Sequence, residues 1–321
     1  MKLFEESDLD SLRRKTLIYA TLRAWGGQGL FEALAGGQLR TAEDLGVSER
    51  GLDVTGQVIQ ELGLVRRDGN RWELTPVGAD LWARGVLDLV SAQDFFGTLA
   101  KIDQVLRTGD PARKTTIGVL ESDPEHTRSF LEMLHRRSET SVAATADILR
   151  PLLCPSARIL DAGGGHGRYG EVLRLRFGSR VTLLDCDVAV DLAQERYGSE
   201  QSYIVGDFMD CELGGPYDAV LLSNIVHGLG PEELARLLGR LVACLVPGGL
   251  LVLKDMFVGG GCDPEIAAAF GVQMLLATQS GRTYSVDQIT ELVTAQGFAP
   301  PTCHPVPTCG FSLLVSAGPG A

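Results

Sequence analysis

The sequence predicts an α/β protein whose second half carries a parallel sheet and whose first part is mainly helical and ends in a hairpin. Three observations lead to this fold class. Apolar runs alternate with amphipathic segments from residue 157 onward, a glycine-rich loop follows the first run, and residues 1–85 follow a helix, turn, helix, hairpin order. With 321 residues, of which 45% are hydrophobic and 22% charged, the chain is long enough for two domains and too apolar for disorder.

The N-terminal segment is predicted to form short helices followed by a hairpin. An apolar helical stretch is expected over residues 17–30, and the pattern at Thr41 predicts a short capped helix. Ser48 is expected to cap a further helix that runs to Leu62, and two short strands are expected on either side of a turn at residues 68–70. This order is typical of a winged helix.

Charge argues against a winged helix that binds DNA. The expected recognition helix, residues 48–61, carries three acidic residues and one arginine, whereas phosphate contacts need a basic excess. The whole chain has a net charge of −12 and a pI of about 4.9. We therefore expect no nucleic-acid partner and assign this domain a structural or dimerising role.

The composition divides the chain into three parts. Residues 1–100 are expected to form the winged-helix-like domain and residues 101–150 a helical linker. Residues 151–321, which begin at two closely spaced prolines, are expected to form the α/β domain. Its strands are expected where Val, Ile and Leu cluster, at 158–161, 181–185, 203–205, 219–222 and 250–253.

Membrane insertion, secretion and metal binding are not expected. A spanning helix needs roughly 20 consecutive apolar residues, and the longest candidate, residues 241–253, is interrupted by a Pro-Gly-Gly sequence. The acidic N-terminus lacks the apolar core of a signal peptide, so a cytoplasmic location is expected. Seven cysteines are expected to be reduced. Cys303, His304 and Cys309 lack a second ligand pair, so no metal site is predicted.

Acidic residues at three strand ends indicate the ligand of the α/β domain. Asp161 ends the first strand, before a glycine-rich loop and a helix start that offer close backbone approach and free N–H groups. Asp185 ends the second strand, where it can accept hydrogen bonds from ribose hydroxyls. Asp207 follows the third strand beside Phe208, where an adenine amino group can donate. Since a carboxylate before the glycines repels pyrophosphate and attracts a cationic amino acid, the pattern favours S-adenosylmethionine over NAD.

In these motifs the chain resembles the S-adenosylmethionine-dependent small-molecule O-methyltransferases, a family that includes caffeate, isoflavone, acetylserotonin and bacterial natural-product enzymes. The resemblance rests on Asp161-Ala-Gly-Gly-Gly-His-Gly167, Asp185, Gly206-Asp-Phe208, the strand end before His227, and Pro247-Gly-Gly249. It implies a Rossmann-like class I catalytic domain with a mostly parallel seven-stranded sheet over residues 151–321, preceded by a mainly α winged-helix dimerisation domain. It also implies a homodimer.

The resemblance further assigns residues to the cofactor. Contacts carry over to five positions, Gly163, Gly165, Asp185, Asp207 and Phe208. Asp161 is added to this predicted site because its negative charge would attract the cationic amino-acid part of the cofactor. Where many plant members have a lysine, this chain has Ser223, whose hydroxyl could still reach the cofactor. These seven positions form the predicted cofactor site.

Methyl transfer to an oxygen requires alignment of the reactants and removal of the acceptor's proton. His227 follows the fourth strand, at the edge where such sheets bind ligands, and the resemblance makes it the catalytic base. Asp255, at the end of the fifth strand, matches the family's acidic residue that orients the base. The chain departs from the family pattern at two places. Gly228-Leu229 follows the histidine, and Gly281 lies near the place of a second acid in plant members, so methyl transfer to a carbon acceptor stays an alternative.

The acceptor pocket is expected to be apolar, with walls from Phe130, Met133, Phe270 and Met274. We therefore predict an O-methyltransferase that acts on a hydroxyl of a small aromatic or natural-product metabolite. Three alternatives stay open. One is a C-methyltransferase for an enolisable keto acid or other carbon acceptor, with or without a metal, and another is a cofactor-binding winged-helix regulator. The third is a dinucleotide-dependent oxidoreductase, because Gly165-x-Gly167-x-x-Gly170 also fits the dinucleotide fingerprint.

Overall fold

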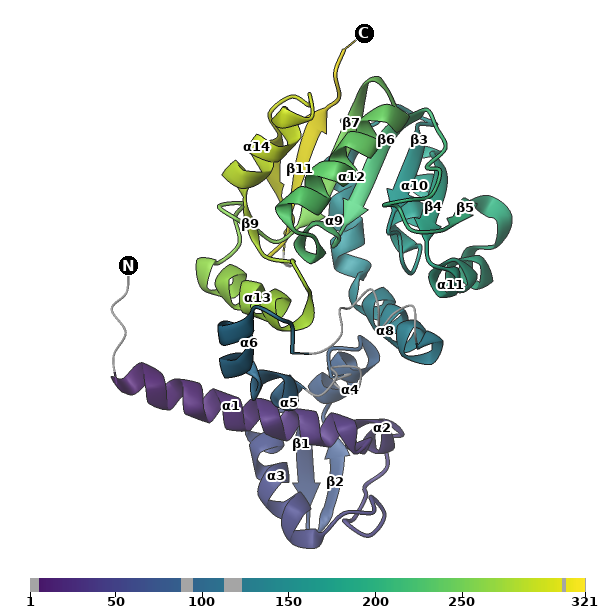
Figure 1. The fold of residues 1–321 in the computed structure, drawn as a ribbon. Helices are drawn as coiled ribbons and strands as arrows, with labels where there is room; N and C mark the ends of the chain where they lie inside the picture. The colour runs from purple at the N-terminus through teal and green to yellow at the C-terminus, as the bar shows by residue number, and fades with distance from the viewer. Residues whose placement is uncertain (1–5, 88–94, 113–122, 308–309, 321) are drawn as a thin grey trace. The chain divides into compact units, whose positions relative to one another are not determined.

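The structure is a computed structural model that describes residues 6–87, 95–112, 123–307 and 310–320. The chain divides into two compact units, Met1–Gln93 and Asp94–Ala321, each considered by itself below (Figure 1). The domain boundaries expected at residues 100 and 150 stay predictions of the sequence.

The N-terminal unit contains helices followed by a hairpin, in the order that the sequence predicted. Its elements are α1 (Glu6–Gly27), α2 (Leu30–Ala35), α3 (Glu49–Glu61), β1 (Val65–Asp68), β2 (Arg71–Leu74) and α4 (Pro76–Ala83). Strands β1 and β2 pair antiparallel. The core of this unit is built around aromatic side chains, of which Trp25, Phe31 and Trp72 are buried and in ring contact.

One helix start in this unit was predicted correctly and another was wrong. Ser48 caps α3, because its Oγ accepts a hydrogen bond from the Gly51 backbone N–H at 3.1 Å. At Thr41 the predicted capping bonds do form with Asp44, yet the segment stays a series of turns. Gly46 adopts a left-handed φ of 66°. The chain therefore leaves the helical conformation at Gly46, before a second helical turn can form.

The second unit begins with helices. They are α5 (Phe95–Leu99), α6 (Ile102–Thr108), α8 (Pro124–Arg137) and α9 (Glu139–Leu149). The helical linker expected over residues 101–150 is interrupted at Gly109, whose left-handed conformation ends α6. Residues 88–94 and 113–122 lie outside the described part. Helix α8 packs against α11 (Asp187–Tyr197), and α9 packs against α10 (Arg168–Phe177).

The second unit is built on a seven-stranded, mostly parallel sheet, which confirms the predicted α/β class. Its strands are β3 (Arg158–Ala162), β4 (Arg180–Asp185), β5 (Ser202–Val205), β6 (Tyr217–Ser223), β7 (Leu245–Asp255), β10 (Thr302–Pro305) and β11 (Ser312–Ala317). The strand order is β10-β11-β7-β6-β3-β4-β5. Strands β3 to β7 are mutually parallel, whereas β11 and β10 are antiparallel. All five predicted strands are present, each longer than predicted.

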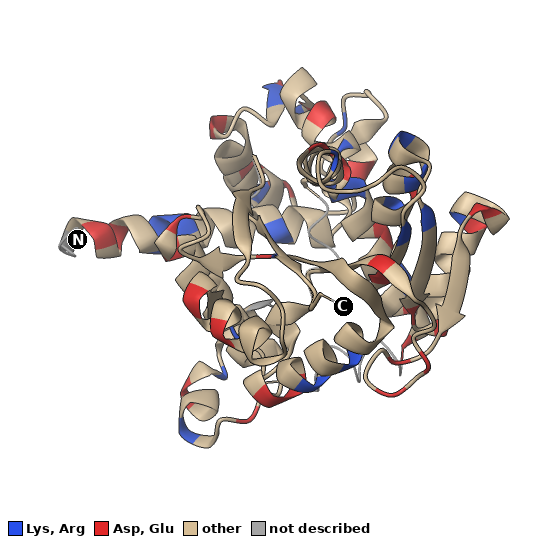
Figure 2. Ribbon diagram, turned by 90° about the horizontal axis from the view of Figure 1, so that it is seen from above, with Lys and Arg blue, Asp and Glu red and all other residues tan. Residues whose placement is uncertain are grey.

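Helices cover both faces of this sheet. On one face, α12 (Pro231–Cys244) and α14 (Val286–Ala295) pack on a cluster that contains Leu160 and Leu222. On the other face, α9 and α10 pack on a cluster that contains Ile159 and Val252. In this unit the charged residues lie mainly on the helices and loops, while the seven strands of the sheet are mostly uncharged (Figure 2). Within the described ranges no helix is long and apolar enough to cross a bilayer.

The remaining elements connect the late strands. The short helices η1 (Gly198–Glu200) and η2 (Val226–Gly228) follow α11 and β6, and α13 (Pro264–Ala277) follows β7. A small parallel pair, β8 (Phe257–Val258) and β9 (Tyr284–Ser285), flanks α13. In a parallel sheet the carboxyl ends of the strands meet at one edge. The loops after β3, β4, β5, β6 and β7 therefore gather there.

Candidate functional site

The glycine loop after β3 lies against the strand ends on either side of it. Gly163, Gly165 and Gly167 have left-handed φ values of 72°, 52° and 73°, which only glycine adopts at low cost. The Gly165 backbone N–H donates to Asp185 Oδ2 at 2.8 Å, so the loop is tied to the end of β4. A Cβ on Gly163 would collide with the Ile225 side chain. The loop therefore lies in close contact with the segment after β6.

Asp161 lies beneath this loop and is completely buried. Neither of its carboxyl oxygens has a hydrogen-bond partner among the described groups. Burial, reinforced by the negative charge of Asp185, raises the pKa of Asp161 to about 7. An unpartnered buried carboxyl next to a glycine loop is the arrangement expected where a ligand supplies the missing donor.

The other predicted cofactor residues lie along the same edge. Both oxygens of Asp185 accept backbone N–H groups, from Gly165 and Cys186, while desolvation raises the pKa of this carboxyl. Asp207 follows β5, and its Oδ1 accepts from the Met209 backbone N–H at 2.7 Å. Its second oxygen accepts no hydrogen bond from the part of the chain that the structure describes.

Phe208 and Ser223 complete this group. A Cβ on Gly163 would lie 3.5 Å from Phe208 Cε1, so the aromatic ring borders the glycine loop. The hydroxyl of Ser223, the last residue of β6, is buried and has no partner within the described ranges. The structure thus brings Gly163, Gly165, Asp185 and Phe208 together, with Asp161 beneath them and Ser223 on the neighbouring strand.

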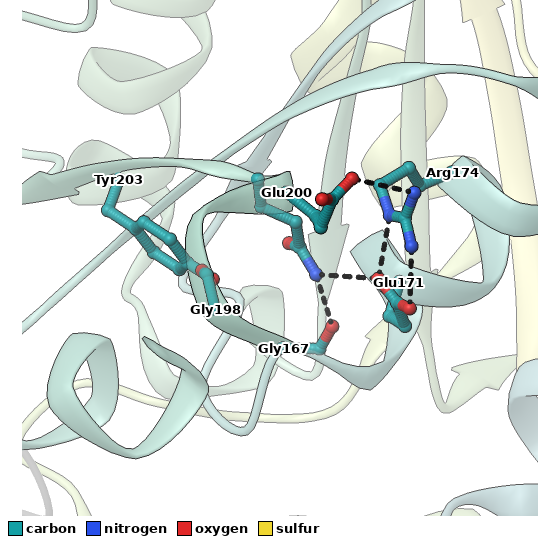
Figure 3. Close-up of polar contacts among 7 residues, drawn as sticks. Gly167, Glu171, Arg174, Gly198, Glu200 and Tyr203 are labelled. Atoms are coloured by element: carbon teal, nitrogen blue, oxygen red, sulfur yellow. Dashed lines mark hydrogen bonds and ion pairs between the residues drawn. The ribbon is translucent and has the colours of Figure 1, made fainter. Parts of the chain in front are cut away.

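A buried glutamine, Gln201, connects the glycine loop to the start of β5, and Figure 3 shows Gly167 and Glu171, the two residues that it bonds. Gln201 Nε2 donates to the Gly167 carbonyl oxygen and to Glu171 Oε2, both at 3.5 Å. Arg174 holds Glu171 through two hydrogen bonds of 2.9 and 3.0 Å and also bonds Glu200. Sequence patterns did not identify Gln201, because its partners are distant in the chain.

His227 and Asp255 form a tight pair at the ends of β6 and β7. His227 Nδ1 lies 2.8 Å from Asp255 Oδ1 and 2.9 Å from Oδ2, and the His227 backbone N–H donates to Oδ2 at 3.1 Å. The Asp255 side chain is 1% exposed and that of His227 is 19% exposed. Because Asp255 occupies Nδ1, the other ring nitrogen, Nε2, is the one left to take up a proton.

Of the four predicted pocket residues, Phe270 contacts His227 directly. The two rings are 4.9 Å apart at an interplanar angle of 77°, an edge-to-face contact. Met274 is buried one turn later on α13, on the same side of the helix as Phe270. Phe130 and Met133 lie on α8. Leu131, on the same helix, borders Gly165. Whether those two residues wall the acceptor pocket stays a prediction.

Two further features of this unit escaped the sequence analysis. Lys254, next to Asp255, is buried inside β7, a placement that a lysine within an apolar run could have signalled. His135 and His166 are in edge-to-face contact, and burial together with nearby arginines lowers their pKa values to about 4 and about 3. Both rings are therefore neutral at pH 7.

In the segment with Cys303, His304 and Cys309, the histidine has a protein partner. His304 Nε2 lies 2.9 Å from the Thr302 hydroxyl within β10. Cys309 lies outside the described residues. In the part of the chain that the structure covers, no three His, Cys, Asp or Glu residues gather as metal ligands.

Comparisons with known proteins agree with this geometry. A family model described as an O-methyltransferase domain matches residues 112–299. 3-Hydroxy-5-methyl-1-naphthoate 3-O-methyltransferase of Streptomyces sahachiroi is 28% identical over 323 residues, which cover 94% of this chain and 89% of that protein. Acetylserotonin O-methyltransferase of Rattus norvegicus is 25% identical over 313 residues, covering 90% and 72%. The solved structure of human N-acetylserotonin methyltransferase in complex with SAM shares the fold, with a TM-score of 0.82, 17% identity and coverage of 99% and 100%.

Proposed function

Because the chain belongs to the O-methyltransferase family, we propose that methyl donor and acceptor meet at the carboxyl edge of its sheet, between the glycine loop and His227. The family match covers more than half of the chain and confirms the resemblance predicted from the sequence. The protein is an enzyme that transfers a methyl group from S-adenosylmethionine to a hydroxyl of a small molecule. The dinucleotide and regulator hypotheses thereby lose their support.

The residues at this edge fit S-adenosylmethionine, which supplies a methyl group activated by a sulfonium. The two unpartnered oxygens of Asp161 suit a positively charged amino group. Asp185 keeps lone pairs after binding two backbone N–H groups, and these suit ribose hydroxyls. Asp207 and Phe208 offer an acceptor and an aromatic wall for adenine. Ser223 adds a hydroxyl that has no partner in the described part of the chain, while Gly163 and Gly165 in the loop permit close backbone approach.

His227 acts as the general base and Asp255 orients it. A phenol with a pKa of about 10 is mostly protonated at neutral pH, so a positioned base accelerates its reaction. The acceptor oxygen would bond to the methyl carbon as that carbon's bond to the donor sulfur breaks and the sulfur leaves as a neutral thioether, while the acceptor's proton passes to His227 Nε2. Asp255 holds Nδ1–H at 2.8 Å and stabilises the imidazolium that results. The His227–Asp255 hydrogen bond is the single observation that carries this role.

The acceptor is an aromatic hydroxyl compound. The Phe270 ring lies edge-on to the base, and Met274 continues the same apolar side of α13. Phe130 and Met133 would complete the pocket wall from α8. The name of the Streptomyces sahachiroi relative specifies a hydroxynaphthoate, which is an aromatic hydroxyl compound.

The N-terminal unit serves as a dimerisation domain, and the protein is a homodimer of cytoplasmic location. Helix α1 exposes Leu9, Leu12 and Leu17, and the Leu17 side chain is 70% exposed. Such apolar side chains on an otherwise polar helix suit a second copy of the same chain. The net charge of −12 supports a protein partner over nucleic acid.

Incubation of the purified chain with methyl-labelled S-adenosylmethionine and a set of hydroxynaphthoates and simpler phenols tests this function. We expect labelled methyl ethers, with the methyl position on oxygen established by NMR. Label attached to a ring or side-chain carbon would contradict O-methylation. Donor binding without transfer to any aromatic hydroxyl would contradict the assigned acceptor class.

A further inference from the structure

Lys254 is a cation buried in the strand that carries Asp255. It is 1% exposed, and no carboxylate lies within ion-pair distance of it in the described ranges. Its ammonium nitrogen lies 4.1 Å from the ring centre of Phe311 and 5.5 Å from that of Tyr169. A cation buried without a counter-ion is costly, and aromatic faces offset part of that cost. The surroundings therefore fix the position of this ammonium closely.

The third group around the ammonium is Asn224. Lys254 Nζ donates to Asn224 Oδ1 at 3.4 Å, and the Asn224 backbone N–H donates to the Lys254 carbonyl oxygen at 2.9 Å. Asn224 has a φ of 61°, the left-handed conformation that non-glycine residues adopt only at some cost. It directly follows β6, so its conformation sets the direction in which the chain leaves the sheet toward His227.

Two successive residues of β7 thus anchor the short segment that carries the base. Lys254 binds Asn224 on the face of the sheet that α10 covers, since Tyr169 belongs to that helix. Asp255 binds His227 on the opposite face, because successive side chains of a strand alternate. The Lys254 side chain accordingly lies on the face of the sheet away from His227 and contacts the segment that carries the base through Asn224.

We propose that Lys254 is a positioning residue for methyl transfer. Its ammonium holds the Asn224 side chain, keeps the turn after β6 in its left-handed conformation, and so keeps His227 seated on Asp255. This inference rests on the proposed role of His227 as the base.

Two substitutions remove the contact from either side. Lys254→Met keeps the apolar stem without the ammonium, and Asn224→Gly keeps the left-handed backbone without the amide. We expect either variant to lower kcat by about 10-fold or more through misalignment of the base, with the Kd for S-adenosylmethionine unchanged. Because both substitutions break the same contact, the double variant should lose no more of its kcat than either single variant does.

Control variants separate positioning from general damage. Asn224→Asp keeps an oxygen acceptor for the ammonium and should retain the wild-type kcat within about twofold. Lys101→Met removes a lysine that bonds a backbone carbonyl elsewhere in this unit, and it should leave kcat unchanged. If Lys254→Met does not fold, Asn224→Gly, at a partly exposed position, carries the test.

A measurement without donor gives an independent readout. In the wild-type chain, the proton that His227 Nδ1 shares with Asp255 should give a slowly exchanging NMR signal. We expect that signal to broaden or vanish in Lys254→Met and Asn224→Gly and to persist in Asn224→Asp. Unchanged kcat and an unchanged signal in Asn224→Gly would overturn the proposal, as would additive losses in the double variant.

Failure of this inference is distinguishable from failure of the proposed function. If His227→Ala keeps its turnover, His227 is not the base, and the positioning role falls with it. If His227→Ala loses turnover while Lys254→Met and Asn224→Gly keep theirs, the base is correct and the Lys254 proposal alone is wrong.

Discussion

At the scale of single residues, Asp161 shows how burial changes the chemistry of a side chain. An exposed aspartate titrates near pH 3.9, whereas burial and the neighbouring Asp185 raise the pKa of Asp161 to about 7. The nearby Gly170 backbone N–H, which does not reach hydrogen-bond geometry with either oxygen, opposes this shift without cancelling it. Near neutral pH, Asp161 is therefore partly protonated, and a cationic ligand beside it would favour the charged form.

This shift predicts a pH-dependent stability. Between about pH 4 and about pH 7 the unfolded chain loses the Asp161 proton while the folded chain keeps it, so this group destabilises the fold as pH rises. Asp161→Asn should lack that decline. Urea denaturation of both chains without donor, at several pH values in this range, measures it. Parallel stability curves for the two chains would show that Asp161 titrates normally.

At the scale of elements, the glycine loop depends on a partner outside its own sequence. Gln201, next to β5, bonds the carbonyl of Gly167 where α10 begins, and Arg174 fixes Glu171 beside it (Figure 3). A Cβ on Gly170 would lie 2.7 Å from Gln201 Oε1, so the glutamine fills the space that this glycine leaves. The loop is thus held from behind by a side chain that does not face the ligand edge.

Substitution of Gln201 should weaken donor binding more than catalysis. Gln201→Leu leaves the Gly167 carbonyl without its side-chain partner, and the loss of one such bond is worth about 1 kcal/mol. We expect a Kd for S-adenosylmethionine roughly fivefold higher, with kcat at saturating donor nearly unchanged.

Tyr203→Phe is the matched control for Gln201→Leu. It removes the hydrogen bond from the Tyr203 hydroxyl to the Gly198 carbonyl in the same region, without touching the loop (Figure 3). Its donor Kd, measured by calorimetry, should equal that of the wild type. Equal Kd values for Gln201→Leu and Tyr203→Phe would show that Gln201 does not support the loop.

Local patterns predicted those elements whose determinants lie within a few residues. The Ser48 cap, the hairpin and the five parallel strands were predicted because hydroxyl caps, turn residues and apolar runs act locally. At Thr41 the local capping bonds form, yet a left-handed Gly46 follows too closely for a helix. At Gly109 a left-handed glycine likewise ends a segment whose composition suggests continued helix.

At the scale of the whole molecule, two compact units carry separate cores. The N-terminal unit packs around Trp25, Phe31 and Trp72, while the second unit packs on the two faces of its sheet. Separate cores allow the N-terminal unit to associate with a second copy without change in the catalytic unit. The exposed leucines of α1 make that unit the proposed dimer contact.

Substitution of an α1 leucine tests the dimer. Leu17→Glu should shift the protein from dimer to monomer in light scattering at micromolar concentration, because a charge would be buried in the interface. Leu175→Glu, which changes a leucine of α10 that is 65% exposed, should leave the dimer intact. A monomeric wild type, or a dimer unaffected by Leu17→Glu, would contradict the assigned contact.

The sequence predicted the strand-end residues of the proposed site but not the residues that support them. Asp161, Asp185, His227 and Asp255 follow apolar runs, and a parallel sheet brings such positions to one edge. Lys254 and Gln201 act through partners 30 residues or more away, which no local pattern specifies.

The most direct test of the account is a paired measurement on His227→Ala. The variant should bind S-adenosylmethionine with the wild-type Kd, because the carboxylates and glycine loop proposed to hold it are untouched. Its single-turnover methyl transfer to an accepted phenol should be slower by about 10²-fold or more. Transfer at the wild-type rate would contradict the claim that the His227–Asp255 pair removes the acceptor's proton.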